Sequence, residues 1–205
     1  MKILVAALLL HLTGGMAGAG EPKADRPLED SLRRVVEQDY AEEDLQRMLF
    51  VSVPRQRMYL VEDGVFARSW VVSTAKAGTG NRKNSLKTPL GLHEVCSKHG
   101  RGVPLGGIFK GRIYTGKQAE IISDETDLDS DDVTSRVLRL CGRESGRNKG
   151  GQVDTFERRV YIHGTPEEGL LGNPASNGCV RMKNDEIIEL FEMVDVGIPV
   201  LILDL

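Results

Sequence analysis

The sequence has few cysteines, few aromatic residues and no strong excess of charge of either sign. Its 205 residues include three cysteines and one tryptophan, and the formal net charge is -3. Nucleic-acid-binding chains usually carry a strong basic excess, so this charge balance argues against a nucleic-acid partner. Hydrophobic residues make up 40% of the chain and charged residues 28%, as in ordinary soluble globular proteins. Without an internal repeat, the length fits one domain with short appendages.

The apolar run Ile3 to Leu12 is too short to cross a bilayer on its own. Lys2 precedes the run, and the small residues Ala17-Gly18-Ala19 follow it. This order is typical of a secretory signal peptide, here residues 1–19, with an uncleaved anchor or a buried helix as the alternative. No cysteine follows the run, which argues against a lipoprotein. We therefore expect the mature chain to act outside the cytoplasm, without a transmembrane segment.

Apolar spacing predicts a mainly β (α+β) fold. Residues 20–48 begin with a polar linker and continue with apolar residues at helical spacing, which predicts one or two amphipathic helices. From Leu49 short apolar runs alternate with turns such as Asp63-Gly64, which predicts a β-meander with no βαβ alternation. The expected strands cover residues 50–53, 58–61, 65–67, 70–73, 93–99, 133–140, 160–162 and 200–203. A helix is expected over residues 184–194, with Asn184 as its N-cap.

Two clusters of polar residues suggest metal sites, but their geometry argues against both. Histidine and cysteine recur at intervals of three in residues 93–99, and positions three apart on a strand point to opposite faces, which does not suit tetrahedral zinc. The six acids of residues 123–132 imitate the start of a calcium loop. However, Asp132 stands where that loop needs glycine, and Leu138 stands where it needs glutamate. We expect no metal, and a solvated loop over residues 123–132.

One stretch of the chain carries residues suited to nucleophilic chemistry. The strand-like run 160–162 ends at His163, and Cys179 follows sixteen positions later, after a loop rich in glycine, proline and asparagine. The thiolate is the reactive form of cysteine, and an imidazole is well suited to take its proton near neutral pH. Gly178 lets the backbone approach a substrate closely, and a helix starting beside the cysteine would stabilise a thiolate. A buried structural thiol beside an ordinary loop histidine is the alternative.

The residues around this pair resemble the signature of the L,D-transpeptidase (YkuD-type) catalytic domain. The signature is carried by His163-Gly164-Thr165 and by Ser176-Asn177-Gly178-Cys179-Val180-Arg181. Three further segments are similar to that family: Gln56 to Leu60, Thr88 to Gly91 and Gly197 to Val200. The resemblance covers roughly Leu49 to Leu203. One position departs from it, because many members carry histidine where this chain has Asn177.

The resemblance implies a role for each residue of the signature. Cys179 would be the nucleophile, His163 would take and return its proton, and the backbone carbonyl of Gly164 would orient the imidazole. The expected substrate contacts are Ser176, Gly178 and Arg181. Backbone N–H groups around Gly178 and Cys179 are the candidates for an oxyanion hole. For Arg181 a structural ion pair is the alternative. The resemblance implies no cofactor.

The resemblance further implies a β-rich, β-sandwich-like catalytic domain over residues 49–205, with a helix after the cysteine. Such a domain would act on peptidoglycan stem peptides in the periplasm or at the cell wall. A Cys179 thioester would release D-alanine, and the amine of a second stem peptide would resolve it into a 3-3 cross-link. Four cations in the loop before the expected cleft would attract peptide carboxylates: Lys76, Arg82, Lys83 and Lys87.

Other functions share this site or this fold. With water as the acceptor the enzyme would be a carboxypeptidase or an amide hydrolase, and with an envelope protein as the acceptor it would anchor that protein to the wall. A non-catalytic wall-binding module is disfavoured because Cys179 and His163 are both present. A sortase-like transpeptidase would add a catalytic arginine, and the spacing of the signature fits the L,D-transpeptidase better.

Three cysteines in an oxidising compartment leave one thiol over. If Cys179 is the nucleophile it stays free, so the only compatible disulfide joins Cys96 to Cys141. The sequence does not decide whether this disulfide forms, because it does not fix the separation of the two Cα atoms.

Overall fold

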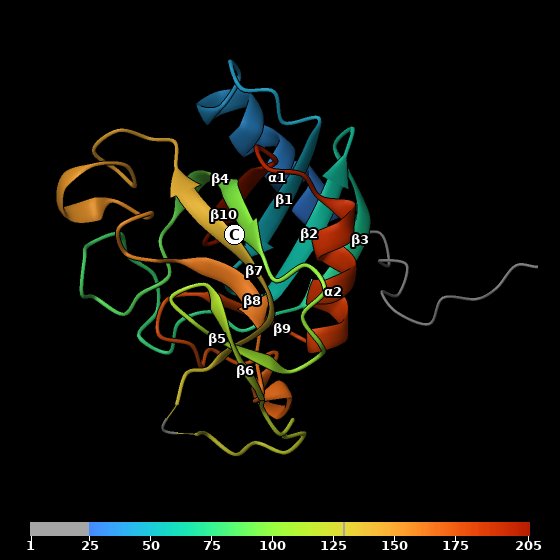
Figure 1. Cartoon of the computed structure of the whole chain (residues 1–205). Helices are drawn as coiled ribbons and strands as arrows, with labels where there is room; N and C mark the ends of the chain where they lie inside the picture. The colour runs from blue at the N-terminus through green and yellow to red at the C-terminus, as the bar shows by residue number, and fades with distance from the viewer. Residues whose placement is uncertain (1–24, 129) are drawn as a thin grey trace, which may run out of the picture.

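The structure is a computed structural model that describes residues 25–128 and 130–205. The expected signal peptide, residues 1–19, lies outside the described residues. The described part forms ten strands and two α-helices (Figure 1). The strands are β1 (Arg47–Ser52), β2 (Arg57–Glu62), β3 (Val65–Val71), β4 (Gly91–His99), β5 (Gly107–Lys110), β6 (Ile113–Gln118), β7 (Val133–Gly142), β8 (Tyr161–Gly164), β9 (Val180–Met182) and β10 (Pro199–Leu203). The helices are α1 (Arg26–Asp39) and α2 (Asn184–Met193), and single 3-10 turns span Gly151–Val153 and Glu168–Leu170. The predicted mainly β fold is confirmed.

The ten strands belong to one sheet that curls back on itself. The order along the sheet is β3-β2-β1-β10-β4-β7, after which β7 pairs with β8 and β8 with β9, while the β5–β6 hairpin also pairs with β7. The pairs β1–β10 and β8–β9 are parallel. Ser73, two residues beyond β3, exchanges both backbone hydrogen bonds with Arg181 of β9, at 3.0 and 2.9 Å. The layers of the expected sandwich-like domain are therefore two parts of a single sheet that closes at Arg181.

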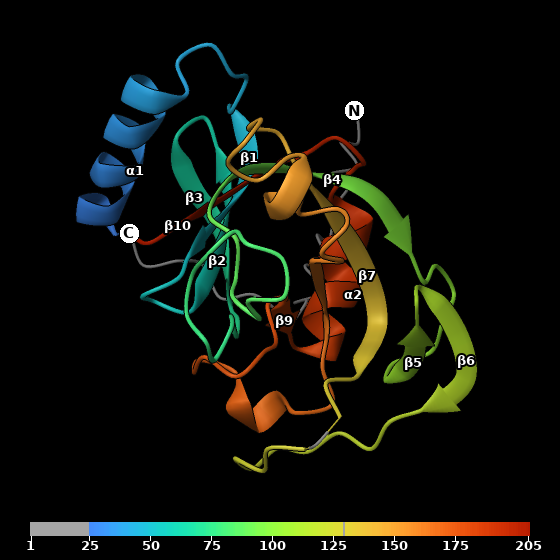
Figure 2. The ribbon, with the colours of Figure 1, turned by 90° about the vertical axis from the view of Figure 1, so that its left-hand side faces the viewer.

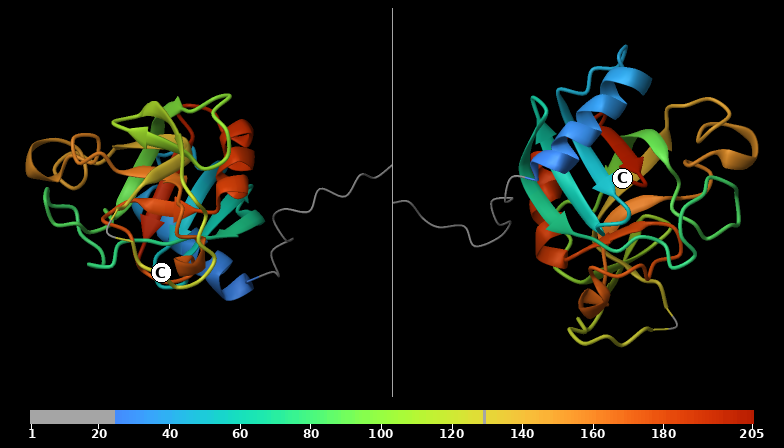
Figure 3. Two further views of the ribbon diagram at one scale, coloured as in Figure 1. Left: turned by 60° about the horizontal axis from the view of Figure 1, so that its bottom comes forward. Right: turned by 180° about the vertical axis from the view of Figure 1, so that it is seen from behind.

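Side chains of the first strands alternate between two hydrophobic clusters. In β1, Leu49 and Val51 belong to the inner cluster, whereas Phe50 belongs to the outer one. Helix α2 packs on β7 and β8 and completes the inner cluster. Helix α1 covers the outer cluster through Leu28 and Leu32, so the two helices lie on opposite sides of β1–β3 (Figure 2, Figure 3). Because both faces of β1 and β2 are buried, their sequences contain continuous apolar runs without polar alternation.

The N-terminal segment forms one helix, shorter than the apolar spacing over residues 28–48 predicts. Helix α1 ends at Asp39, and Tyr40 is its C-cap. Leu45 reaches the outer cluster from the segment before β1, and Met48 reaches it from β1 itself, so their spacing reflects burial without a second helix. Neither helix in the described part of the chain is both long and apolar enough to cross a membrane.

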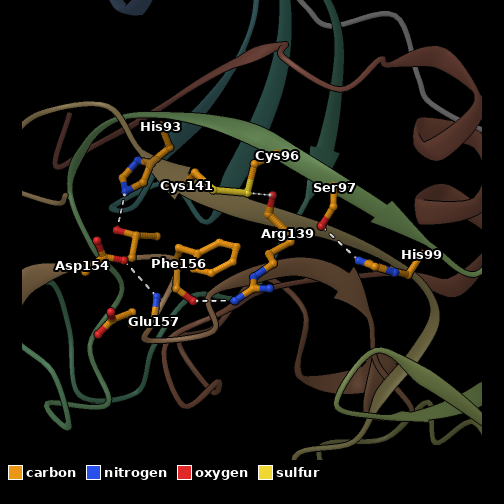
Figure 4. Close-up of a disulfide and its surroundings, with 10 residues drawn as sticks. His93, Cys96, Ser97, His99, Arg139, Cys141, Asp154, Phe156 and Glu157 are labelled. Atoms are coloured by element: carbon orange, nitrogen blue, oxygen red, sulfur yellow. Dashed lines mark hydrogen bonds between the residues drawn. A yellow bond between two sulfur atoms is a disulfide. The ribbon is translucent and has the colours of Figure 1, made fainter. Parts of the chain in front are cut away.

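A disulfide joins Cys96 of β4 to Cys141 of β7, with 5.8 Å between the two Cα atoms (Figure 4). The register of the β4–β7 pair shifts between Val95 and Ser97, so Cys96 lies at the irregularity. The bridge is the one that a free Cys179 allows, and Cys179 is free in the structure.

The histidines beside this disulfide bond to protein groups. His93 is buried, with Nδ1 at 2.9 Å from the carbonyl of Gly91 and Nε2 at 3.2 Å from the hydroxyl of Thr155. Burial lowers the pKa of His93 to about 4, so its ring is neutral. His99 Nε2 lies 3.0 Å from the hydroxyl of Ser97. These contacts give the polar residues of 93–99 a structural role.

We predict that reduction of the Cys96–Cys141 disulfide lowers the thermal stability of the protein. The bridge links residues 45 positions apart, and the chain-entropy model gives about 4 kcal/mol for a loop of this size. The thermal midpoint, measured with and without a reductant, should fall by about 10 °C. In the Cys96→Ala/Cys141→Ala control the midpoint should be low in both conditions. A wild-type midpoint that the reductant leaves unchanged would contradict the prediction.

Candidate active site

The parallel strands β8 and β9 bring the predicted histidine and cysteine together. His163 lies opposite Arg181 in the register of this pair. Cys179 stands two positions before Arg181, and Tyr161 stands two positions before His163. The backbone N–H of Tyr161 donates to Cys179 Sγ at 3.3 Å, so the sulfur is level with Tyr161. Residues two apart on a strand share a face, so Cys179 and His163 project from the same face on neighbouring strands.

The predicted helix over residues 184–194 is confirmed as α2 (Asn184–Met193), but its start does not lie beside the cysteine as expected. Strand β9 follows Cys179, and α2 begins only at Asn184. The backbone N–H of Asn184 donates to Glu168 Oε1 at 2.9 Å, so a carboxylate of the protein occupies the positive end of the helix. The predicted N-cap is also wrong, because Lys183 holds that position. The Asn184 side chain is buried, and it donates to the carbonyl of Thr165 at 2.6 Å.

His163 is held in one orientation and one tautomer. The ring is buried, and Nδ1 lies 2.7 Å from the backbone carbonyl of Gly164, the contact that the resemblance implied. A carbonyl can only accept, so Nδ1 carries the hydrogen and Nε2 is left as the basic nitrogen. Burial lowers the pKa of His163, although the carboxylate of Asp131 and the bond to Gly164 oppose this shift. The resting imidazole is therefore neutral.

Cys179 rests as a thiol. Its Sγ accepts the N–H of Tyr161 and points its hydrogen toward the carbonyl of Arg159, at 3.7 Å. Burial raises the pKa of the Cys179 thiol to about 12, and the carboxylate of Asp131 adds to the rise. The residue is partly exposed in a pocket, so water moderates this effect. No hydrogen bond joins Sγ to His163 among the described residues, so the resting pair is a thiol and an imidazole rather than an ion pair.

The turn before the cysteine uses two of the expected substrate contacts for its own structure. Ser176 Oγ donates to the carbonyl of Cys179 at 2.6 Å and accepts the N–H of Gly178 at 3.2 Å. Gly178 has φ +122, and a Cβ there would lie 3.3 Å from the carbonyl oxygen of Lys87. Of the two expected oxyanion donors, the Gly178 N–H is therefore occupied. The Cys179 N–H has no hydrogen-bond partner in the described part of the chain.

Arg181, the third expected contact, forms the ion pair that was its alternative. Its Nη2 lies 2.8 Å and its Nε 3.0 Å from Asp131 Oδ1. Its Nη1 lies 2.9 Å from Glu167 Oε2, as an ion pair without hydrogen-bond geometry. The side chains of Arg181 and Glu167 are 3% and 0% exposed. A guanidinium held by two carboxylates has little charge to offer a substrate.

Asp131 was expected in a solvated loop, and that expectation is wrong for this residue. Its side chain is 22% exposed, and its second oxygen accepts the backbone N–H of Asn177 at 3.1 Å. Burial would raise the pKa of Asp131, but the imidazole of His163 when it is protonated and the guanidinium of Arg181 outweigh this effect and hold the pKa low. Asp131 is therefore an anion that connects Arg181, the imidazole and the turn before the cysteine. Nothing in the sequence separates it from the other acids of residues 123–132.

A pocket of about 300 Å³ opens at the cysteine. Among its lining residues are Lys83, Leu86, Glu157, Arg158, Gly178 and Cys179. Two of the cations expected to attract carboxylates are paired within the protein: Lys76 lies 2.8 Å from Asp127, and Lys83 pairs with Glu157. The positive charge that the pocket offers to a ligand therefore comes from residues other than the cations predicted from the sequence.

The fold and the site define a β-rich domain with a thiol and an imidazole on one strand pair. The family model described as the L,D-transpeptidase catalytic domain (YkuD) matches residues 46–202. The chain therefore belongs to the family of L,D-transpeptidase catalytic domains.

Individual relatives match shorter segments. The putative L,D-transpeptidase YqjB of Bacillus subtilis (strain 168) is 53% identical over 47 residues, which cover 22% of this chain and 27% of that protein. The putative L,D-transpeptidase YkuD of the same strain is 36% identical over 61 residues, which cover 27% of this chain and 37% of that protein. The matches thus span well under two thirds of either relative. Among solved structures, an L,D-transpeptidase from Mycobacterium smegmatis shows 19% identity and a TM-score of 0.47, with 77% of this chain and 58% of that chain covered.

We predict that Glu167→Gln lowers the free energy of unfolding by about 3 kcal/mol, because the buried guanidinium of Arg181 loses one of its two carboxylates. Urea unfolding at neutral pH measures the change. Asp127→Asn is the matched control, since it removes a carboxylate from the exposed pair with Lys76, and it should cause no measurable loss. Equal effects of the two substitutions would be incompatible with a structural role for the buried pair.

We also predict that the resting thiol reacts slowly at neutral pH. Because the pKa of Cys179 is raised, its thiolate fraction grows with pH and is still growing at pH 9. The rate of alkylation by iodoacetamide, followed by mass spectrometry, should rise about tenfold per pH unit from pH 6 to 9 without a plateau. Cys179→Ala should take up no label, since the other cysteines are bridged. A plateau below pH 7 would instead indicate a preformed thiolate–imidazolium pair.

Proposed function

We propose that this chain is a secreted cysteine L,D-transpeptidase that acts on peptidoglycan stem peptides. One observation carries the proposal: Cys179 and His163 share one face of the β8–β9 pair, and the carbonyl of Gly164 leaves Nε2 as the basic nitrogen. Membership of the family supplies the reaction class. The matches span only part of each relative, so family membership does not fix the donor, the acceptor or the product, and these three are proposed here.

The first half of the reaction forms a thioester. The thiol proton of Cys179 passes to His163 Nε2, and Sγ attacks the carbonyl carbon of the diamino-acid residue beside a terminal D-alanine. A C–S bond forms, the C–N bond to D-alanine breaks, and His163 gives its proton to the departing amine. The free backbone N–H of Cys179 supports the oxyanion that develops between these steps.

The second half of the reaction transfers the acyl group. The amine of a second stem peptide gives a proton to His163 Nε2 and attacks the thioester carbon. A C–N bond forms, the C–S bond breaks, and Sγ takes the proton back from the imidazolium. The product is a 3-3 cross-link between two diamino-acid residues, and Cys179 returns to its resting thiol.

Asp131 assists the proton transfers in this scheme. Its carboxylate raises the pKa of His163, so it stabilises the imidazolium that forms in both halves of the reaction. The same carboxylate disfavours a free thiolate at Cys179. The first effect helps the imidazole to accept the proton, and the second keeps the sulfur protonated until it attacks.

The proposal includes a location outside the cytoplasm, in the periplasm or at the cell wall. The Cys96–Cys141 disulfide supports it, because disulfides persist in oxidising compartments and are rare in the cytosol. A donor made of peptidoglycan is also found only there.

We predict that the mature protein converts purified tetrapeptide-containing muropeptides into a cross-linked dimer with loss of one D-alanine, detected by mass spectrometry. Cys179→Ala should form no product, because no thioester can form. His163→Ala should be slower by about 10²–10⁴-fold, as expected for the loss of a general base. An unchanged thermal midpoint is the control for folding of both variants.

Other products would contradict this proposal, and each would identify a different reaction. Free tripeptide without dimer would identify water as the acceptor and the enzyme as a carboxypeptidase. Cleavage of cross-linked dimers would identify an amide hydrolase. The absence of any cysteine-dependent product would contradict cross-linking, and would leave anchoring of an envelope protein or a non-catalytic wall-binding role.

A further inference from the structure

Arg158 is a cation without a carboxylate partner in the pocket that holds Cys179. Both residues line this pocket, and so does the ion pair of Lys83 with Glu157, which carries no net charge. Within residues 25–128 and 130–205, no acidic side chain forms an ion pair with Arg158. Its positive charge therefore remains uncompensated beside the sulfur.

The guanidinium of Arg158 is fixed by neutral acceptors. Its Nη1 donates to the carbonyl of Gly80 at 3.1 Å, and its Nη2 donates to the carbonyl of Lys87 and lies 3.5 Å from the hydroxyl of Ser85. Burial lowers the pKa of Arg158, whereas a negative Cys179 raises it, so the two groups are within electrostatic reach of each other. The acceptors hold the side chain in place but leave its charge available to an anion in the pocket.

We propose that Arg158 forms a carboxylate subsite of the Cys179 pocket, which takes the free C-terminal carboxylate of the residue that leaves the donor peptide. The proposal rests on the proposed function. In such a donor only the amide nitrogen and one carbon separate the carboxylate carbon from the carbonyl carbon that sulfur attacks. A group that binds this carboxylate must therefore lie in the same pocket as the nucleophile, and a guanidinium presents paired N–H donors that match two carboxylate oxygens.

Two other cations near the cysteine have carboxylate partners of their own. Arg181 is held by Asp131 and Glu167, and Lys83 by Glu157. A charge already neutralised by a carboxylate gains little from a second one. Arg159 also lines the pocket without a carboxylate partner among the described residues, but its side chain is exposed and no hydrogen bond fixes it there. Arg158 is therefore the fixed, partly buried guanidinium that a substrate carboxylate would stabilise most.

Two small alkylating reagents test the subsite without a peptide. Iodoacetate and iodoacetamide have nearly the same size, and both form an Sγ–C bond at Cys179 with loss of iodide and of the thiol proton. Only iodoacetate carries a carboxylate. We expect the ratio of the iodoacetate rate to the iodoacetamide rate to be about tenfold lower in Arg158→Gln than in the wild type, as for one lost charge-assisted hydrogen bond. Arg158→Lys, which keeps the charge, should restore part of the ratio.

Lys87→Gln is the matched control. It removes one positive charge from the segment that Arg158 contacts, but Lys87 does not line the pocket and its backbone carbonyl is unchanged. The ratio in this variant should equal that of the wild type. An equal fall in both variants would indicate a general field of positive charge and overturn the proposal. An equal fall of both rates in Arg158→Gln would overturn it too, because Arg158 would then support only the thiol or the loop.

A measurement on the wild-type protein covers the case in which Arg158→Gln does not fold. Acetate at constant ionic strength should protect Cys179 from iodoacetamide in a saturable manner, and acetamide should not. Equal behaviour of the two compounds would overturn the subsite. Because neither measurement needs transpeptidation, an inactive protein that keeps the Arg158-dependent ratio would contradict the proposed function alone.

Donor peptides then identify the carboxylate that binds. A tetrapeptide donor amidated at its C-terminus should lose kcat/KM in the wild type and little further in Arg158→Gln. A donor amidated only on the side-chain carboxylate of its diamino acid should remain sensitive to Arg158→Gln. The reverse pattern would assign the subsite to the diamino acid and overturn the assignment to the leaving residue.

Discussion

The geometry of the site depends on one buried arginine that joins four segments of the chain. The backbone of Arg181 pairs with β8 on one side and with Ser73 on the other, and this pairing closes the sheet. Its guanidinium binds Asp131 and Glu167, which come from loops far apart in the sequence. Breaking such a buried pair costs about 3–5 kcal/mol, so the ion pairs and the strand pairing favour the same arrangement. The cysteine and the histidine keep their relative position because Cys179 stands two residues before Arg181 in the chain and His163 lies opposite Arg181 on β8.

The electrostatics around the pair keep the cysteine in its protonated form. A thiolate is the form that oxidants attack, and the raised pKa of Cys179 keeps that form scarce until a substrate arrives. Asp131 contributes to this protection, and it also stabilises a protonated His163. One carboxylate thus keeps the resting sulfur protonated and stabilises the protonated form of the imidazole.

Local patterns in the sequence were sufficient to predict the strands of the meander and to single out His163 and Cys179. They left Cys96–Cys141 as the one disulfide compatible with a free Cys179, without deciding whether it forms. The helix over residues 184–194 was predicted in its place, but the strand β9 between Cys179 and this helix was not, because β9 has only three residues and exists through its pairing with β8. Asp131 and Arg158 were missed for a related reason. Their partners lie 50 and 78 residues away, and only the folded chain selects one acid from a run of acids or places one arginine beside the sulfur.

The segment from Phe156 to Arg158 contributes to a wall of the pocket, and β7, one of the two strands joined by the disulfide, holds this segment in place. The guanidinium of Arg139 lies 3.3 Å from the centre of the Phe156 ring and donates to the Phe156 carbonyl at 2.9 Å (Figure 4). Arg139 belongs to β7, which the bridge from Cys141 ties to β4. The segment from Phe156 to Arg158 is thereby held at one end by β7 and at the other by the carbonyls of Gly80 and Lys87. A cation that must meet a carboxylate beside a nucleophile gains from such a support, because a fixed side chain loses less conformational entropy when it binds. The disulfide thus supports this wall through β7, the strand that carries Arg139.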